Sequence, residues 1–154
     1  MQLKGTYTIV VRCKDTGYST FGKLGTARLQ RGYYLYTGSA LGRGAVSLER
    51  RLERHCRRRK RVRWHIDYLT SRPNCYVTGA VYVVSDTRLE CKVNSSLSKE
   101  LHVSPVLLKI GASDCNCNGH LLGPVWRLNE CNLMKRVESV YAQFGLPRSY
   151  VVNG

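Results

Sequence analysis

Four side chains that handle protons and phosphate groups follow one another in the first 55 residues of the chain: Tyr7, Tyr36, Arg51 and His55. An arginine can hold a phosphate through two parallel N–H bonds, and a tyrosine or a histidine can transfer a proton when its surroundings adjust its pKa. Further along, Glu90 offers the hard oxygen ligand that Mg²⁺ or Mn²⁺ requires. Together these residue types fit the hydrolysis of a phosphate ester.

The same residues also have structural interpretations. Tyr7 and Tyr36 suit strands that pack a sheet face. Arg51 could be one more solvated charge on a helix, and a lone His55 is more often a core residue than a catalytic one. Glu90 closes the segment Thr87-Arg88-Leu89-Glu90, which fits a capping box in which its carboxylate bonds the backbone of Thr87.

Hydrophobic spacing predicts the elements that position these side chains. Strands are expected over 6–11, 32–37, 76–84 and 106–110, with a short one near 27–29, and helices over 45–56, 64–69, from 86 or 87 onward, and 130–144. A turn is expected over 38–44 and a loop over 111–119. In the first helix, Arg51 and His55 lie one turn apart beside the apolar stripe, so both should be half-buried. No linker or repeat divides the chain, and 1–154 is expected to form one domain of mixed α/β (α+β) class.

Positive charge is concentrated in one segment. Nine of the 25 basic residues fall within 50–63, and the formal net charge of the chain is +15. This charge favours a polyanionic partner, and we expect DNA, with RNA as an alternative, and no membrane partner. The expected phosphate contacts are Arg54, Arg57, Arg58, Arg59, Lys60, Arg61 and Arg63. The alternative is a solvated helix end.

The seven cysteines are scattered, and the first residues lack the apolar core of a signal peptide. We therefore expect a cytoplasmic protein with buried thiols and no disulfide framework. Cys115, Cys117 and His120 raise the question of zinc, but Cys-x-Cys is tighter than the usual spacing. A fourth ligand, such as Cys91 or Cys131, would have to come from elsewhere. The expected cofactor is therefore Mg²⁺ or Mn²⁺, and a zinc-stabilised interaction protein is the weaker interpretation.

Several short segments resemble the GIY-YIG nuclease superfamily. Gly5-Thr6-Tyr7 and Tyr36-Thr37-Gly38 are similar to its two half-motifs, and Arg51 followed by His55 is similar to its helix signature. Further segments resemble the Uri-superfamily branch of this superfamily: 32–42, 64–69, Glu90-Cys91, and 113–117 with His120-Leu121. The resemblance covers about 4–122, and 123–154 is expected to be a C-terminal strand and helix extension.

The resemblance implies a small central, mainly antiparallel sheet flanked by helices. It also implies a metal-dependent endonuclease that cuts DNA and is selective for a structure or a lesion, as in repair. Tyr7 or Tyr36 would be the general base, Arg51 would hold the scissile phosphate and Glu90 would bind the metal. His55 would orient a tyrosine or water, or donate a proton. The alternative is a non-catalytic basic module that keeps the fold and binds DNA or RNA.

Further residues are expected near the site: Ser39, His65, Asp67, Ser113, Asp114 and His120. Ser39 stands where some branches of the family carry a lysine. The late asparagine of many relatives has no secure match, and Asn116, Asn118 or His120 are the candidates for its place. His65 and Asp67 could instead be a structural pair.

Overall fold

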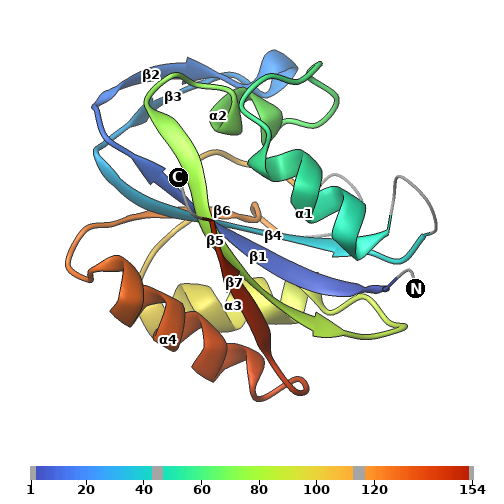
Figure 1. Ribbon diagram of the computed structural model, residues 1–154. Coiled ribbons are helices and arrows are strands. Elements are labelled where there is room, and N and C mark those ends of the chain that lie inside the picture. The colour runs from blue at the N-terminus through green and yellow to red at the C-terminus, as the bar shows by residue number, and fades with distance from the viewer. Residues whose placement is uncertain (1–2, 43–46, 113–116, 153–154) are drawn as a thin grey trace.

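A five-stranded antiparallel sheet, with the order β6-β4-β1-β5-β7, forms the centre of the computed structural model (Figure 1). The structure describes residues 3–42, 47–112 and 117–152. The strands of the sheet are β1 (Gly5–Cys13), β4 (Gly32–Ala40), β5 (Cys75–Val84), β6 (Leu121–Val125) and β7 (Arg148–Val151). A separate hairpin joins β2 (Gly17–Thr20) to β3 (Thr26–Leu29) through the 3₁₀ turn η1 (Gly22–Leu24).

Helices cover both faces of this sheet. On one face lie α1 (Leu48–Cys56) and the short α2 (Asp67–Thr70), and on the other lie α3 (Glu90–Leu101) and α4 (Glu130–Tyr141) (Figure 1). Within the described parts of the chain, no helix is both long and apolar enough to cross a bilayer.

Coverage of both faces explains why the central strand β1 is buried nearly throughout. Its odd-numbered residues, including Tyr7 and Ile9, join the core beneath α1 and α2, whereas Val10 joins the core beneath α3 and α4. Thr8 is also buried, and its hydroxyl lies 2.7 Å from those of both Thr37 and Tyr141. These hydrogen bonds allow polar residues to occupy the core beneath α3 and α4.

The fold class predicted from sequence, a mainly antiparallel sheet flanked by helices, is confirmed. The strands at 6–11 and 32–37 are longer than predicted. The turn expected from residue 38 begins only after Ala40, because Gly38, Ser39 and Ala40 continue the pairing with β1. α1 begins at Leu48, and the predicted start at Ala45 lies outside the described residues.

The strand predicted over 106–110 is wrong. This segment forms turns, and Lys109 has a positive φ of 71°. The segment after it forms β6, which is an edge strand of the sheet although it contains Pro124. An edge position tolerates proline because one side of the strand needs no ladder donor.

The cysteine prediction also needs correction at one position. Cys13 and Cys75 are opposite each other in the β1–β5 register and form a disulfide, although 62 residues separate them in sequence. Both are buried, as expected, but they are not thiols.

Candidate active site

A pocket lies where the edge of β4 is no longer covered by β6. The pairing of β4 with β6 reaches Tyr36 opposite Leu121, whereas the pairing of β4 with β1 continues to Ala40. The pocket beside this stretch has a volume of about 360 Å³, and its lining includes Tyr36, Ser39, Arg51, His65, Glu90 and Gly111. Residues distant in sequence and carried by β4, α1 and α3 therefore share one cavity.

Two larger hollows, of about 440 and 500 Å³, lie elsewhere on the surface. One is lined by the end of α3 and by 124–128, and the other by α1 and β7. Neither contains any of the five predicted catalytic residues, so the chemistry of the lining identifies the site better than its size does.

Arg51 is held firmly at the pocket wall. Its Nη1 donates a hydrogen bond of 2.7 Å to the carbonyl of Ser39, and its guanidinium carbon lies 4.9 Å from the centroid of the Trp64 ring. Its Nε is buried and makes no hydrogen bond with any residue that the structure describes. The guanidinium is therefore oriented by protein contacts, and Arg51 lines the pocket, where a guanidinium can donate to an anion.

Behind this wall, Tyr7 and His55 form a buried pair. The hydroxyl of Tyr7 lies 2.8 Å from Nε2 of His55, and both side chains are about 1% exposed. Burial, with the nearby charge of Lys60, lowers the pKa of His55 to about 3, so the imidazole is neutral at physiological pH. His55 also lies against the rings of Tyr36 and Trp64, at centroid distances of 5.8 and 6.0 Å.

Burial acts on both tyrosines of the site in the opposite direction. It raises the pKa of Tyr7 to about 12 against the opposing influence of Arg51, and it raises the pKa of Tyr36 further above its ordinary value. Gly38, which lines the pocket, leaves room for Tyr7, because a Cβ there would lie 2.7 Å from the tyrosine hydroxyl. The hydroxyl of Tyr7 is thus directly behind the pocket floor.

Glu90 is the first residue of α3, and its side chain is 15% exposed at the pocket. The capping box that the sequence suggested is not formed, because the helix is capped at Leu89, whose N–H donates to Thr6 Oγ1 at 3.2 Å. Arg88 Nη1 approaches the Glu90 carboxylate at 3.5 Å. A single carboxylate fits Mg²⁺ or Mn²⁺, since such ions take their remaining ligands from water and substrate phosphate.

Arg54 does not belong to the exposed basic face, in contrast to the prediction. It forms an ion pair with Asp67 at 2.7 and 2.8 Å, and the two side chains are 14% and 0% exposed. Asp67 also accepts hydrogen bonds from the backbone N–H groups of Arg63 and Trp64. Burial alone would raise the pKa of Asp67, but Arg54 and these N–H groups keep it below its usual value.

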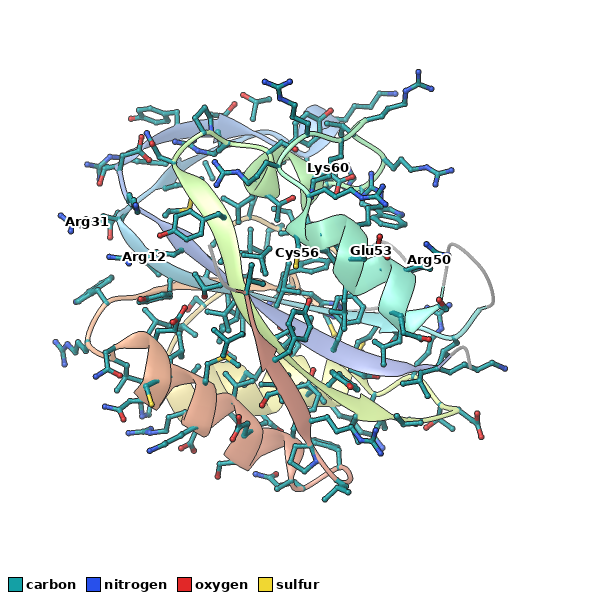
Figure 2. The ribbon with its side chains drawn as sticks, in the orientation of Figure 1. Arg12, Arg31, Arg50, Glu53, Cys56 and Lys60 are labelled. Carbon is teal, nitrogen blue, oxygen red and sulfur yellow. A yellow bond between two sulfur atoms is a disulfide. The ribbon has the colours of Figure 1, made fainter. Side chains whose placement is uncertain are left out.

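Lys60 likewise has a structural position. Its Nζ donates to the carbonyls of Arg54 and His55 at 3.0 Å and lies 2.9 Å from Thr70 Oγ1. Burial lowers the pKa of Lys60 to about 8. Figure 2 shows Lys60 beyond the end of α1, whereas Arg50 and Glu53 lie along the outer side of that helix.

Five of the predicted phosphate contacts remain exposed: Arg57, Arg58, Arg59, Arg61 and Arg63. Arg57 pairs weakly with Glu53, and Arg58 donates to the carbonyl of Pro73. Arg63 lines the pocket itself, so the exposed arginines continue from the pocket along the segment 57–63. We call these five residues the arginine surface.

The other predicted neighbours divide into two groups. His65 and Ser39 line the pocket, whereas the carboxylate of Asp67 lies in the buried ion pair and, among the described residues, bonds Arg54 and the N–H groups of Arg63 and Trp64 rather than His65. His120 is buried behind Gly111, at which a Cβ would lie 2.8 Å from the Tyr36 ring and 3.2 Å from His120 Cβ. Ser113, Asp114, Cys115 and Asn116 lie outside the described residues.

Sequence reasoning missed the role of Trp64. Its ring faces the guanidinium groups of both Arg51 and Arg54, whose carbons lie 4.9 and 4.4 Å from its centroid. In the sequence, Trp64 stands out only as an aromatic residue at the start of the segment 64–69, which carries part of the family resemblance. Its packing on α1 depends on how residues 57–63 return along that helix, which the spacing of residue types does not specify.

The fold and the pocket define a protein of α+β class with a polar, basic site at the edge of a single antiparallel sheet. A family model described as a domain of unknown function, DUF123, matches residues 6–145, and the chain belongs to this family. A search of the curated proteins and a search of the solved structures each found no significant match.

Proposed function

We propose that this protein is a metal-dependent endonuclease that hydrolyses phosphodiester bonds in DNA and is selective for a structure or a lesion rather than a base sequence. The resemblance of its motifs to the GIY-YIG superfamily, Uri branch, supports the proposal. The observation that carries it is the shared pocket of Tyr36, Arg51 and Glu90, with Tyr7 and His55 directly behind it.

Arg51 is suited to hold the scissile phosphate. Its bond to the Ser39 carbonyl and its stacking on Trp64 fix the guanidinium plane before substrate arrives. A fixed donor group loses little conformational freedom on binding and can follow the charge that develops in the transition state.

Tyr7 is the better candidate for the general base. Nδ1 of His55 is buried without a hydrogen-bond partner among the described residues, so a proton there would be an orphaned donor. We therefore assign the imidazole proton to Nε2, from which it donates to the Tyr7 oxygen. This hydrogen bond and the charge of Arg51 both favour the tyrosinate, whereas the pKa of Tyr36 is raised further.

Glu90 is the proposed ligand of the divalent ion. When bound, Mg²⁺ or Mn²⁺ would add positive charge beside the phosphate and the leaving oxygen. This added positive charge is needed because a pKa of about 12 leaves Tyr7 protonated at neutral pH. His55, with a pKa of about 3, orients Tyr7 and is not a proton donor in its charged form.

The test is a cleavage assay with branched, abasic, single-stranded and plain duplex DNA in the presence of Mg²⁺ or Mn²⁺. Glu90→Gln should lower cleavage by a factor of about 10² or more while leaving most DNA binding. The matched control is Glu100→Gln, because Glu100 is an exposed residue on the same helix and should not matter. Cleavage that survives EDTA, or that persists in folded Glu90→Gln, would refute the mechanism.

A non-catalytic nucleic-acid-binding module is the second candidate. It is favoured by the presence of Ser39 in place of the lysine of some related branches, and by Glu90 being the one carboxylate among the described residues that line the pocket. Tight, salt-sensitive binding of DNA or RNA without turnover of any substrate would support this alternative.

A further inference from the structure

Three metal-ligand side chains meet on the far side of Gly111 from the pocket. They are Cys91, Cys117 and His120, and their ligand atoms all lie within 4.8 Å of one another. The sulfur of Cys91 is 3.8 Å from Nε2 of His120. His120 is fully buried and both cysteines are partly buried.

The separation of Cys91 and His120 is close to that of a sulfur and a nitrogen ligand in a tetrahedral zinc centre. Bonds of about 2.3 Å to sulfur and about 2.0 Å to nitrogen place a sulfur and a nitrogen ligand about 3.6 Å apart. The observed distance of 3.8 Å between Cys91 and His120 is slightly longer, and a small rotation of either side chain would remove the difference.

The backbone that carries these ligands is already fixed by hydrogen bonds. His120 N–H donates to the Ile110 carbonyl at 2.7 Å, and the His120 carbonyl accepts from Thr37 N–H at 3.2 Å. Asn94, one turn after Cys91 in α3, donates through Nδ2 to the Gly119 carbonyl at 2.9 Å. The helix and the segment 117–120 are thus joined before any ion is considered, as a preorganised site requires.

We propose that Cys91, Cys117 and His120 bind a thiophilic transition-metal ion, with Zn²⁺ as the expected occupant. Thiolate and imidazole ligands select zinc over Mg²⁺, so this site is chemically separate from the carboxylate of Glu90. With the three ligands found among the described residues, a tetrahedral ion would have a further position for water or another donor. The tight Cys-x-Cys spacing argued against zinc in the sequence, but the structure supplies Cys91 from α3.

The position of the ion gives it a structural role. Cys91 follows Glu90 directly, and His120 lies behind Gly111, which touches the Tyr36 ring in turn. An ion here would hold the start of α3 to the segment that supports the pocket wall. Metal binding does not depend on the proposed nuclease activity; only its effect on the pocket does.

The experiment measures metal in the full chain, purified under reducing conditions and without chelator, by mass spectrometry of the elements. We expect one equivalent of zinc, which excess Mg²⁺ does not displace and which Cys91→Ser with Cys117→Ser removes. Cys131→Ser is the matched control, because Cys131 is an exposed cysteine on α4 and should leave the zinc content unchanged.

Cobalt provides a readout that does not rely on the folding of a variant. Co²⁺ added to metal-free wild-type protein should produce thiolate charge-transfer absorption in the near ultraviolet and visible bands of a tetrahedral site. Absence of both zinc and the cobalt spectrum would overturn the proposal, as would unchanged zinc in the double variant or a Cys91–Cys117 disulfide in the purified protein. None of these readouts uses DNA, so a failure of the proposed cleavage is recognised separately.

Discussion

Tyr7 and His55 share a hydrogen bond of 2.8 Å, and both side chains are almost fully buried. Because one residue comes from the central strand and the other from α1, this bond fixes the helix relative to the sheet. Both groups are held neutral at physiological pH by burial, which lowers the pKa of His55 and raises that of Tyr7. The pair therefore links the stability of the fold to the chemistry of the pocket.

This link predicts a pH dependence of stability. The pKa of His55 is near 6.5 in the unfolded chain and about 3 in the folded protein, so the unfolded state binds the extra proton between these values. The contribution of neutral His55 to the unfolding free energy is fully present above pH 6.5 and is lost as the pH falls toward 3. At pH 4.5 the loss should be about 2–3 kcal/mol.

Urea unfolding at pH 7.5 and 4.5 measures this loss, and His55→Gln is the comparison because glutamine carries no titrating group. The variant should be less stable at pH 7.5 but should lose about 2–3 kcal/mol less on acidification. Equal losses in the two proteins would show that other groups, such as Asp67, account for the acid sensitivity.

The Arg54–Asp67 ion pair should contribute much more to stability than the exposed pairs on the same helix. Arg54→Ala leaves the carboxylate of Asp67 buried without its partner, which should cost about 3–5 kcal/mol of unfolding free energy. Arg57→Ala removes an exposed pair with Glu53 and should cost less than about 1 kcal/mol. Similar values for the two variants in urea unfolding would contradict the assignment of Arg54 to the interior.

The two tyrosines should differ in their effect on cleavage. Tyr7→Phe removes the proposed base and its bond to His55, and we expect cleavage to fall by a factor of about 10² or more. Tyr36→Phe keeps the ring that packs on His55 and should lower cleavage less. Single-turnover rates between pH 6 and 10 check this, and a larger loss for Tyr36→Phe would transfer the base role to that residue.

The arginine surface should determine how strongly DNA binding depends on salt. Each phosphate contact contributes about 0.9 to the slope of log K against log salt, so Arg59→Ser with Arg61→Ser should reduce that slope by about 1–2. Arg28→Ser with Arg31→Ser removes the same charge outside the segment 57–63, and Figure 2 shows Arg31 well away from Lys60. An equal change in this control would indicate that the net charge acts as a whole.

Periodicity in the sequence was sufficient to place Tyr7, Tyr36, Arg51 and His55 on two strands and a helix, because these elements are regular and the residues lie on their buried sides. It failed for Arg54, which shares a helix face with exposed arginines and is buried only because residues 63–67 return to cover it. It also failed for Cys13 with Cys75, and it left Cys91 and Cys131 as equal candidates to join His120. Those pairs arise from strand register and helix docking, which local spacing does not encode.

The helix that begins with Glu90 packs its Val93 and Leu97 into the opposite layer of the molecule, away from α1. The acidic group of the cavity is thus anchored by a core that no substrate would touch. Repacking of that distant layer, by drift or by design, can shift the carboxylate by small amounts while every residue of the cavity stays the same. Substitutions in the core around Val93 and Leu97 would therefore change the position of the Glu90 carboxylate without changing any residue that lines the pocket.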